Sequence, residues 1–171
     1  MDEVEIVDYD RRWPLLFDEE ANRLRAVLEP SLIVGLEHFG STAIPGLSAK
    51  PIIDILIAVR SLAVARATFV EALRKLDYVY WADNPKKDRM FFVKGMPPFG
   101  SRRSHHVHVT EPHGEMWQRL AFRDYLRAHP EEAGTYGRLK RRLAAEHRAD
   151  REAYTDAKSA YVERVMQKAI R

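Results

Sequence analysis

The sequence predicts an α+β fold in which about five strands come first and three helices come last. Short runs rich in β-branched and aromatic residues alternate with helical repeats up to about residue 111. Beyond that point, only helical spacing of apolar residues remains. A chain of 171 residues buries roughly two thirds of its unfolded surface, so it folds without disulfides or metals. We expect a single domain over 1–171, with an α/β part over about 1–111 and a helical part over about 112–171.

The first half of the chain predicts two helices and two strands. Apolar residues repeat at helical spacing over 13–28, and Pro30 ends that helix. A short strand over 32–39 follows. The β-branched run over 51–59 is apolar on both faces, which indicates a buried strand at the centre of the sheet. Apolar residues over 62–76 then share one face of a second helix.

Three further strands and three helices complete the predicted fold. A strand is expected at 78–81. The segments 89–94 and 104–110 are β-rich and joined by a loop with Pro and Gly, so they predict an antiparallel pair. Three helices are predicted over about 114–128, 130–146 and 148–169.

Composition predicts a cytoplasmic protein that does not contact membranes. The chain has no cysteine, which excludes a thiol nucleophile and a cysteine-based zinc site. Its first ten residues mix carboxylates with apolar residues and lack the basic start of a signal peptide. The longest apolar stretch, at 52–59, is interrupted by Asp54 and is too short to span a bilayer.

Positive charge is concentrated in the helical part. The chain has a net charge of +3, and residues 116–171 hold 13 Lys and Arg against 8 Asp and Glu. This asymmetry favours an anionic small molecule such as a nucleotide, although ordinary solvated helices would look the same. The low net charge and the lack of a nucleic-acid motif argue against RNA or DNA as the principal partner.

The segment over 38–58 combines a Gly-Ser turn with an acidic strand. Gly40 lets a ligand approach the main chain, and Ser41 and Thr42 add hydroxyl groups for phosphate oxygens. About a dozen residues later, Asp54 presents a carboxylate. The turn could bind phosphate and the carboxylate could bind a metal ion, which together would form a phosphate-and-metal site. The alternative is an ordinary turn at the end of a strand.

Asp54 interrupts an apolar strand, so it is a candidate metal ligand and, with Ser41, a candidate catalytic residue. A buried carboxylate is costly unless it is hydrogen-bonded, paired or bound to a metal. Alternation places Asp54 on the same face as Leu56. The alternative to a functional site is a buried ion pair with Lys50 or an arginine.

A histidine-rich strand supplies a second candidate cluster. His106 and His108 share one face of the strand, and His105 lies on the other. Side chains two residues apart on a strand can bind one ion, and imidazole suits zinc or manganese better than magnesium. The alternative is an ordinary half-exposed strand with a polar face. If Asp54 lies on a neighbouring strand, the three side chains converge on one site.

The last predicted helix carries a polar stripe. Arg151, Tyr154 and Lys158 follow each other at spacings of three and four, and Tyr161 continues the stripe. Such a stripe can face a cleft, where Arg151 and Lys158 would meet anionic groups and Tyr154 would stack on a base. Alternatively, the tyrosines pack in the core and the charged groups extend to solvent.

Five motifs in this sequence resemble the GrpB family. They are His38-Phe-Gly-Ser-Thr-Ala-Ile-Pro-Gly-Leu, Lys50-Pro-Ile-Ile-Asp-Ile, His105-His-Val-His-Val, Phe122-Arg-Asp-Tyr-Leu-Arg and Tyr154-Thr-Asp-Ala-Lys. The resemblance runs in order over about 4–165. It implies a fold like that of polymerase-β-type nucleotidyltransferases, with a mixed, largely antiparallel sheet, flanking helices and an associated helical half.

The resemblance carries over only in part to the acidic residues. Gly40 and Ser41 match the Gly-Ser signature of that superfamily, and Asp54 matches the first acid of its Asp-x-Asp pair. Leu56 stands where the second acid belongs, so the two-magnesium mechanism is in doubt. The third acid of the superfamily lies on a later strand, in the region that His106 or His108 occupies here.

The sequence therefore favours transfer of a nucleotidyl group from a nucleoside triphosphate to an unknown acceptor. The residues expected to bind phosphate or substrate are Gly40, Ser41, Thr42, Lys50, Arg151, Tyr154 and Lys158. One alternative is a domain that binds a nucleotide or coenzyme without turnover, and another is a His/Asp metal enzyme acting on a small polar molecule. A divalent cofactor is expected: zinc or manganese if the histidines are ligands, and magnesium if only Asp54 is.

Overall fold

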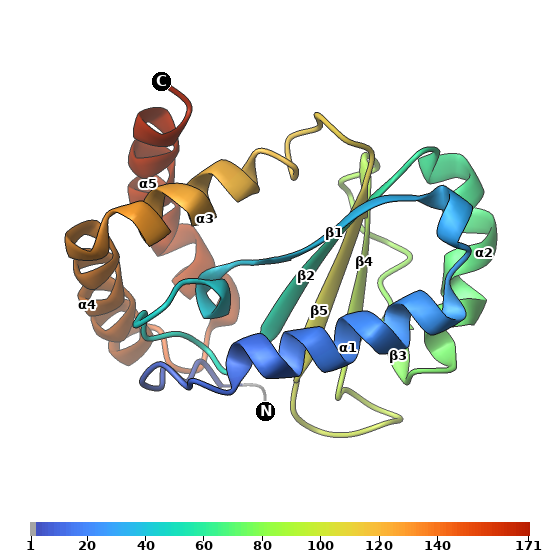
Figure 1. Ribbon diagram of the computed structural model, residues 1–171. Coiled ribbons are helices and arrows are strands. Elements are labelled where there is room, and N and C mark those ends of the chain that lie inside the picture. The colour runs from blue at the N-terminus through green and yellow to red at the C-terminus, as the bar shows by residue number, and fades with distance from the viewer. Residues whose placement is uncertain (1–2) are drawn as a thin grey trace.

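The computed structural model describes residues 3–171 and has a five-stranded sheet with helices on both of its faces (Figure 1). The helices and strands are α1 (Trp13–Val27), β1 (Ile33–Phe39), β2 (Ile53–Val59), α2 (Leu62–Arg74), β3 (Tyr78–Tyr80), β4 (Arg89–Lys94), β5 (His105–Thr110), α3 (Arg119–Ala128), α4 (Pro130–Glu146) and α5 (Arg151–Ala169). Two short 3-10 helices, η1 (Pro30–Leu32) and η2 (Ser41–Ala43), flank β1. The predicted α+β fold, with five strands and three C-terminal helices, is confirmed.

The strand order is β1-β2-β5-β4-β3, and only the pairing of β2 with β5 is parallel. The sheet is therefore mixed and largely antiparallel. The predicted antiparallel pair of β4 and β5 is confirmed. β2 was expected at the centre of the sheet, but β5 occupies the middle position. This difference arises because the chain crosses from β2 through α2, β3 and β4 before β5 returns beside β2.

One face of the sheet packs against α1 and α2. Ile53, Ile55 and Ile57 of β2 point to this face and belong to the main hydrophobic core, together with Leu24 of α1 and Phe69 of α2. All five side chains are almost completely buried. The period of two along β2 thus places its isoleucines in the core and turns Asp54 and Leu56 to the opposite face.

A buried ion pair interrupts this apolar face. The carboxylate of Glu20, on α1, accepts hydrogen bonds of 2.7 and 2.8 Å from the Nζ of Lys94. Nε2 of His105 lies 3.4 Å from the same carboxylate. Burial lowers the pKa of His105 to about 4 although Glu20 opposes this shift, so His105 is neutral at pH 7 and Lys94 supplies the balancing charge.

The opposite face of the sheet meets α3, α4 and α5 (Figure 1). Arg123 of α3 donates from Nη1 to the carboxylate of Glu37 at 2.8 Å and to the backbone carbonyl of His38 at 2.9 Å. Arg127 donates from Nε to the carbonyl of Ala43 at 2.9 Å. Because β1 is an edge strand, these arginines satisfy main-chain groups at its end and fix the helices against it.

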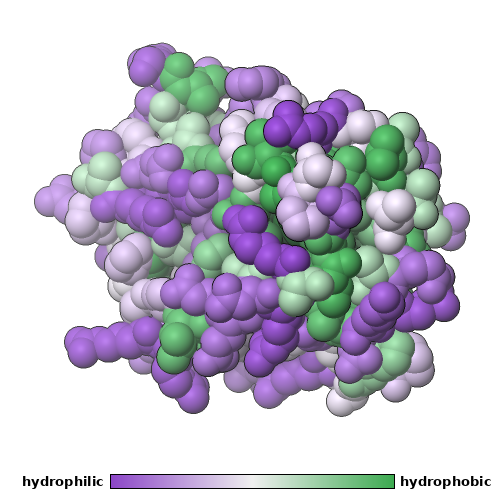
Figure 2. Space-filling model, turned by 45° about the vertical axis from the view of Figure 1, so that its right-hand side comes forward, coloured by the Kyte–Doolittle hydropathy of each residue, from purple (hydrophilic) through white to green (hydrophobic). Residues whose placement is uncertain are grey.

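Several large hydrophobic residues are exposed among the polar residues of the surface. Figure 2 shows one face, on which hydrophobic residues form a broken band among charged and polar ones. Among residues 3–171, no helix is both long enough and apolar enough to cross a bilayer.

Replacing Arg123 should loosen the attachment of α3 to the sheet. We expect Arg123→Met to lower the free energy of unfolding by about 1–3 kcal/mol, because the buried carbonyl of His38 loses its side-chain donor. Urea unfolding measures this change. Arg142→Met is the matched control, since the Arg142 side chain is 68% exposed and pairs with the exposed Glu146, so its effect should stay within about 0.5 kcal/mol. Equal effects of the two substitutions would contradict the assigned role of Arg123.

Candidate functional site

A cleft of about 340 Å³ lies between the sheet and the C-terminal helices. The sheet and the loops around it contribute Asp54, His106, His108, the Gly40–Thr42 turn and Lys50 to its lining. The helices contribute Lys140, Tyr154 and Lys158, among others. The structure therefore brings nine of the ten residues expected to form the site to one cleft, and Arg151 is the exception.

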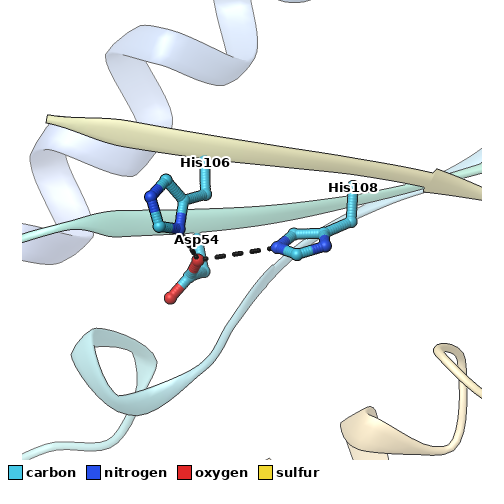
Figure 3. Close-up of side chains that lie close together, drawn as sticks. All are labelled: Asp54, His106 and His108. Carbon is cyan, nitrogen blue, oxygen red and sulfur yellow. Dashed lines mark ion pairs between the residues drawn. The ribbon is translucent and has the colours of Figure 1, made fainter. Parts of the chain in front are cut away.

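Asp54, His106 and His108 converge at the floor of the cleft (Figure 3). The parallel register pairs Asp54 with His106, and His108 follows two residues later on the same face of β5. Oδ1 of Asp54 lies 3.2 Å from Nδ1 of His106 and 3.8 Å from Nε2 of His108. The three side chains therefore converge as the strand pattern predicts. The Asp54 carboxylate is paired with two imidazoles, and not with Lys50 or an arginine as the ion-pair alternative would require.

Electrostatics prepare this cluster to bind a cation. Burial alone would raise the pKa of Asp54, but the neighbouring imidazoles of His106 and His108 outweigh it and hold the pKa well below its usual range. Burial lowers the pKa of His106, although the nearby Asp54 opposes that shift. Near pH 7 the carboxylate is therefore charged and His106 is neutral, which are the protonation states of metal ligands.

The spacing of these three groups fits one metal ion. Ligand atoms bound to a common ion at roughly 2.0–2.2 Å lie about 2.8–3.6 Å from each other at octahedral or tetrahedral angles. One donor atom from each of Asp54, His106 and His108 lies within 4.8 Å of the others, so small side-chain rotations bring them to that spacing. Three protein ligands leave coordination positions for water or substrate.

The glycine of the Gly-Ser turn is held against the Asp54 carboxylate. Gly40 has φ 71° and ψ −173°, a backbone conformation that is essentially restricted to glycine. A Cβ atom at Gly40 would lie 2.6 Å from Oδ2 of Asp54, closer than real contacts allow. The turn and the carboxylate thus pack directly on each other, and Ser41 follows at the cleft wall.

Thr42 lines the cleft but uses its hydroxyl to hold the loop. Its Oγ1 donates to the carbonyl of Ile52 at 3.1 Å and lies 2.9 Å from Nε2 of His38. The His38 ring in turn stacks on Phe17, with ring centroids 4.8 Å apart. This arrangement differs from the expected phosphate contact of the Thr42 hydroxyl, because the loop before β2 needs a fixed attachment to β1.

The cleft brings together three lysines, one from the loop before β2 and two from α4 and α5. Lys50, Lys140 and Lys158 all line the cleft, and within residues 3–171 none of them forms an ion pair with a carboxylate. Lys140 is only 2% exposed. Burial, and then the charges of Lys158 and Arg151, lower the pKa of Lys50 to about 7. Burial and the neighbouring lysines also depress the pKa of Lys140.

Lys140 is a cleft residue that the sequence pattern did not predict. Its ammonium lies 4.8 Å from the ring centroid of Tyr136, one helical turn earlier, and both residues line the cleft. The available signal was this spacing of four on α4, which puts a lysine on the same stripe as a buried tyrosine.

The polar stripe of α5 divides between the cleft and the helical core. Tyr154 is completely buried, and its ring lies 5.2 Å from Nζ of Lys50 and 5.1 Å from Nζ of Lys158. Tyr161 instead packs in the core between α3, α4 and α5. Arg151 borders a smaller neighbouring pocket that it shares with Lys50. One part of the stripe therefore faces the cleft, as the first alternative predicts, and Tyr161 packs in the core, as the second predicts.

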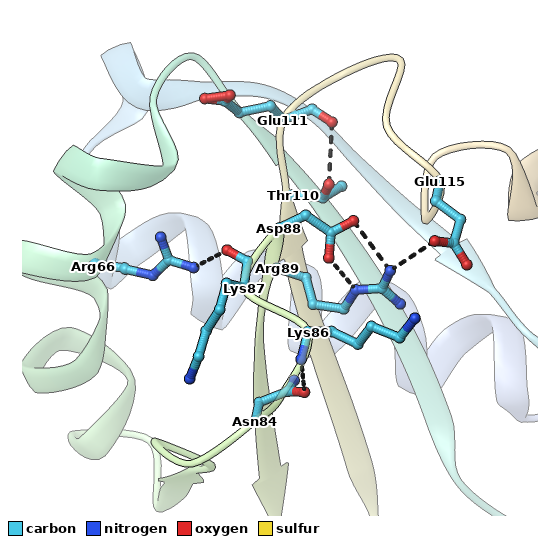
Figure 4. Close-up of polar contacts among 9 residues, drawn as sticks. All are labelled: Arg66, Asn84, Lys86, Lys87, Asp88, Arg89, Thr110, Glu111 and Glu115. Atoms are coloured by element: carbon cyan, nitrogen blue, oxygen red, sulfur yellow. Dashed lines mark hydrogen bonds and ion pairs between the residues drawn. The ribbon is translucent and has the colours of Figure 1, made fainter.

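A polar network fixes the segment that leads from the sheet into α3 (Figure 4). Arg89 of β4 donates from Nε to Asp88 at 2.9 Å, and its Nη2 lies 3.4 Å from Glu115. Met116 follows Glu115 and lines the cleft, so this network sets the position of one cleft wall.

Comparison with known proteins gives a consistent family assignment. The model of the GrpB protein family matches residues 3–168. A UPF0157 protein of Pseudomonas aeruginosa is 46% identical over 170 residues, which cover 99% of this chain and 69% of that protein. The crystal structure of conserved protein GrpB from Enterococcus faecalis matches with a TM-score of 0.86 at 33% identity, covering 96% of each chain. A dephospho-CoA kinase of Mycolicibacterium paratuberculosis is 33% identical over 86% of this chain and 40% of its own length.

Replacing Gly40 should disturb the cluster of Asp54, His106 and His108 as well as the backbone. We expect Gly40→Ala to lower the free energy of unfolding by about 1–3 kcal/mol and to remove most of the thermal stabilisation by Mn²⁺ or Zn²⁺. Gly46→Ala is the matched control, since Gly46 also has positive φ but its Cβ would meet nothing within 4 Å. It should lower stability and keep the metal response, as measured by thermal unfolding. A Gly40→Ala protein that keeps the full response would contradict the packing argument.

Proposed function

This chain belongs to the GrpB family, and we propose that it is a metal-dependent enzyme that transfers a nucleotidyl or related phosphoryl group from a nucleoside triphosphate. One observation carries the proposal: a cluster of possible metal ligands lines the same cleft as three lysines that have no carboxylate partner within residues 3–171. A cation site next to an excess of positive charge suits a ligand with several negative charges, and a polyphosphate chain is the common biological example.

Asp54, His106 and His108 would hold one divalent ion. Two imidazoles and one carboxylate favour zinc or manganese over magnesium, which prefers oxygen ligands. When bound, such an ion polarises phosphoryl oxygens as a Lewis acid. Asp54 supplies the only carboxylate among the described residues that line the cleft, so the bound ion would leave the cleft strongly positive.

The lysines would bind and orient the phosphates. Nζ of Lys50 and Nζ of Lys158 lie 5.2 and 5.1 Å from the centroid of the Tyr154 ring, and Lys140 is more deeply buried, so all three lysines border the same cleft. Mutual repulsion and burial make this arrangement costly in the free protein, and an anion removes the cost. Ser41, at the opposite wall beside Gly40, would donate its hydroxyl to a phosphate oxygen.

Leu56 favours a second candidate, a domain that binds a nucleotide or coenzyme without turnover. Leu56 is completely buried and packs with Phe39 and Met116, so this position offers no ligand for a second ion. Transfer would then depend on one ion and on the positioning of phosphates by lysines. Product formation distinguishes the two candidates, because both predict ligand binding.

The proposed metal ligands give the first test. Mn²⁺ or Zn²⁺ should raise the midpoint of thermal unfolding more than Mg²⁺ does, and Asp54→Asn and His108→Ala should each remove most of that gain. Because protons compete with the ion for the imidazoles, the gain should shrink as pH falls through the histidine range. His147→Ala should behave like the wild type, since His147 lies outside the cleft. A larger shift with Mg²⁺, or unchanged shifts in both site variants, would contradict the proposed ligand set.

The lysines give the second test. Lys158→Ala should weaken binding of a nucleoside triphosphate by about 1 kcal/mol or more in calorimetric titrations with Mn²⁺, through loss of a charge-assisted contact. Lys168→Ala is the control on the same helix, because Lys168 is 55% exposed and pairs with Glu132. Mass spectrometry of the mixtures then detects pyrophosphate release or a nucleotidylated acceptor. Binding without any product would favour the non-catalytic candidate, and absence of binding would end both.

A further inference from the structure

The sheet face that carries the metal-ligand cluster continues beyond the cleft. The strand registers pair Leu56 with His108 and His108 with Phe91, so these side chains form one row across β2, β5 and β4. The backbone amide of Trp81 donates to the carbonyl of Phe91 at 2.9 Å, which extends the row past the end of β3. Among the described residues, the cleft lining includes none from β3 or β4. This part of the face therefore adjoins the cleft without being covered by its walls.

Aromatic rings occupy this uncovered part of the sheet. The Phe91 ring lies 4.7 Å from the ring of His108 and 5.0 Å from that of His106, measured between centroids. Trp81 lies 6.2 Å from Phe91 at an interplanar angle of 76°, and 48% of Trp81 is exposed. These two residues therefore form an aromatic pair beside the imidazoles, and Trp81 remains accessible to a ligand.

We infer that Phe91 and Trp81 form a subsite for the planar ring of the ligand, and that the ligand is a nucleotide held by base stacking. This inference rests on the proposed function, because it assumes that phosphate groups occupy the cleft. The lysines, Asp54 and the imidazoles line the cleft, and the two aromatic rings continue outward from the imidazoles. A nucleotide has the same order of parts: an anionic chain, a sugar and a flat ring. Stacking on aromatic side chains tolerates different bases, so the subsite selects for a ring and not for one base.

The arrangement also fixes the direction of the ligand. The phosphates farthest from the base would lie among Lys50, Lys140 and Lys158, and the phosphate nearest the sugar would lie over Asp54 and the imidazoles. Contact of Phe91 with both imidazoles means that a ring stacked here lies close to the ligand cluster. Inorganic tripolyphosphate shares the charged half of such a ligand and lacks the ring, which makes it the appropriate comparison.

The test compares nucleoside triphosphates with inorganic tripolyphosphate in the presence of Mn²⁺. Calorimetric titration of each of the four ribonucleoside triphosphates should show at least about fivefold weaker binding to Trp81→Ala and to Phe91→Leu. Tripolyphosphate should bind these variants within about twofold of the wild type. Trp81→Phe should restore most of the lost affinity because it keeps a ring. Phe99→Ala is the control: Phe99 is 44% exposed, lies in the loop between β4 and β5, and should bind both ligands normally.

Fluorescence gives an independent readout. A stacked base should quench the emission of Trp81, so nucleoside triphosphate should quench the wild type and not Trp81→Phe, whereas tripolyphosphate should quench neither. Equal losses for both ligands, or no loss in either ring variant, would overturn the ring subsite while leaving the charged cleft intact. If the wild type binds neither ligand, the proposed function fails, and the subsite fails with it.

Discussion

The parallel pairing of β2 with β5 is the constraint on which the rest of the site depends. It is the one parallel pair in the sheet, and it sets Asp54 opposite His106. On the other face of the same strands, Ile53, Ile55 and Val107 are packed in the main core. A shift of one residue would bring Asp54 into that core and expose the isoleucines, so the free energy of apolar burial also enforces the geometry of the cluster. One strand register therefore sets both the packing of the core on one face of the sheet and the geometry of the cluster on the other.

The regular elements could be predicted from the sequence because each depends on local periodicity. The isoleucine run of β2 and the repeats of α1 and α2 have the burial that their spacing implies. The polar face of β5 also indicated which histidines would point the same way. In addition, the Asp54 position in an apolar strand indicated a partner on a neighbouring strand. These inferences needed only alternation and the cost of burying a charge.

The remaining features depend on contacts between distant segments, which periodicity does not encode. β5 took the central position because of a crossover through 62–94 that no local pattern specifies. Glu20 looks like any surface carboxylate of α1, and only the sheet beneath it supplies Lys94 as its partner. Lys140 becomes a cleft residue through the packing of α4 against the loops near η2, where Gly137 approaches Leu47. The sequence does not show that the Thr42 hydroxyl is occupied, because its partners His38 and Ile52 are brought beside it only by the fold.

β5 is attached from both of its sides. His106 and His108 contact Asp54 on one face, and His105 lies beside the buried Glu20 on the other. The neighbouring residues His105 and His106 thus contact different layers of the protein: His105 contacts Glu20 in the core under α1, and His106 contacts Asp54 in the cleft. A strand held in this way has little freedom to slide or twist. The two imidazoles are consequently preorganised, so binding to them would cost the protein less conformational entropy than binding at a site built on a loop.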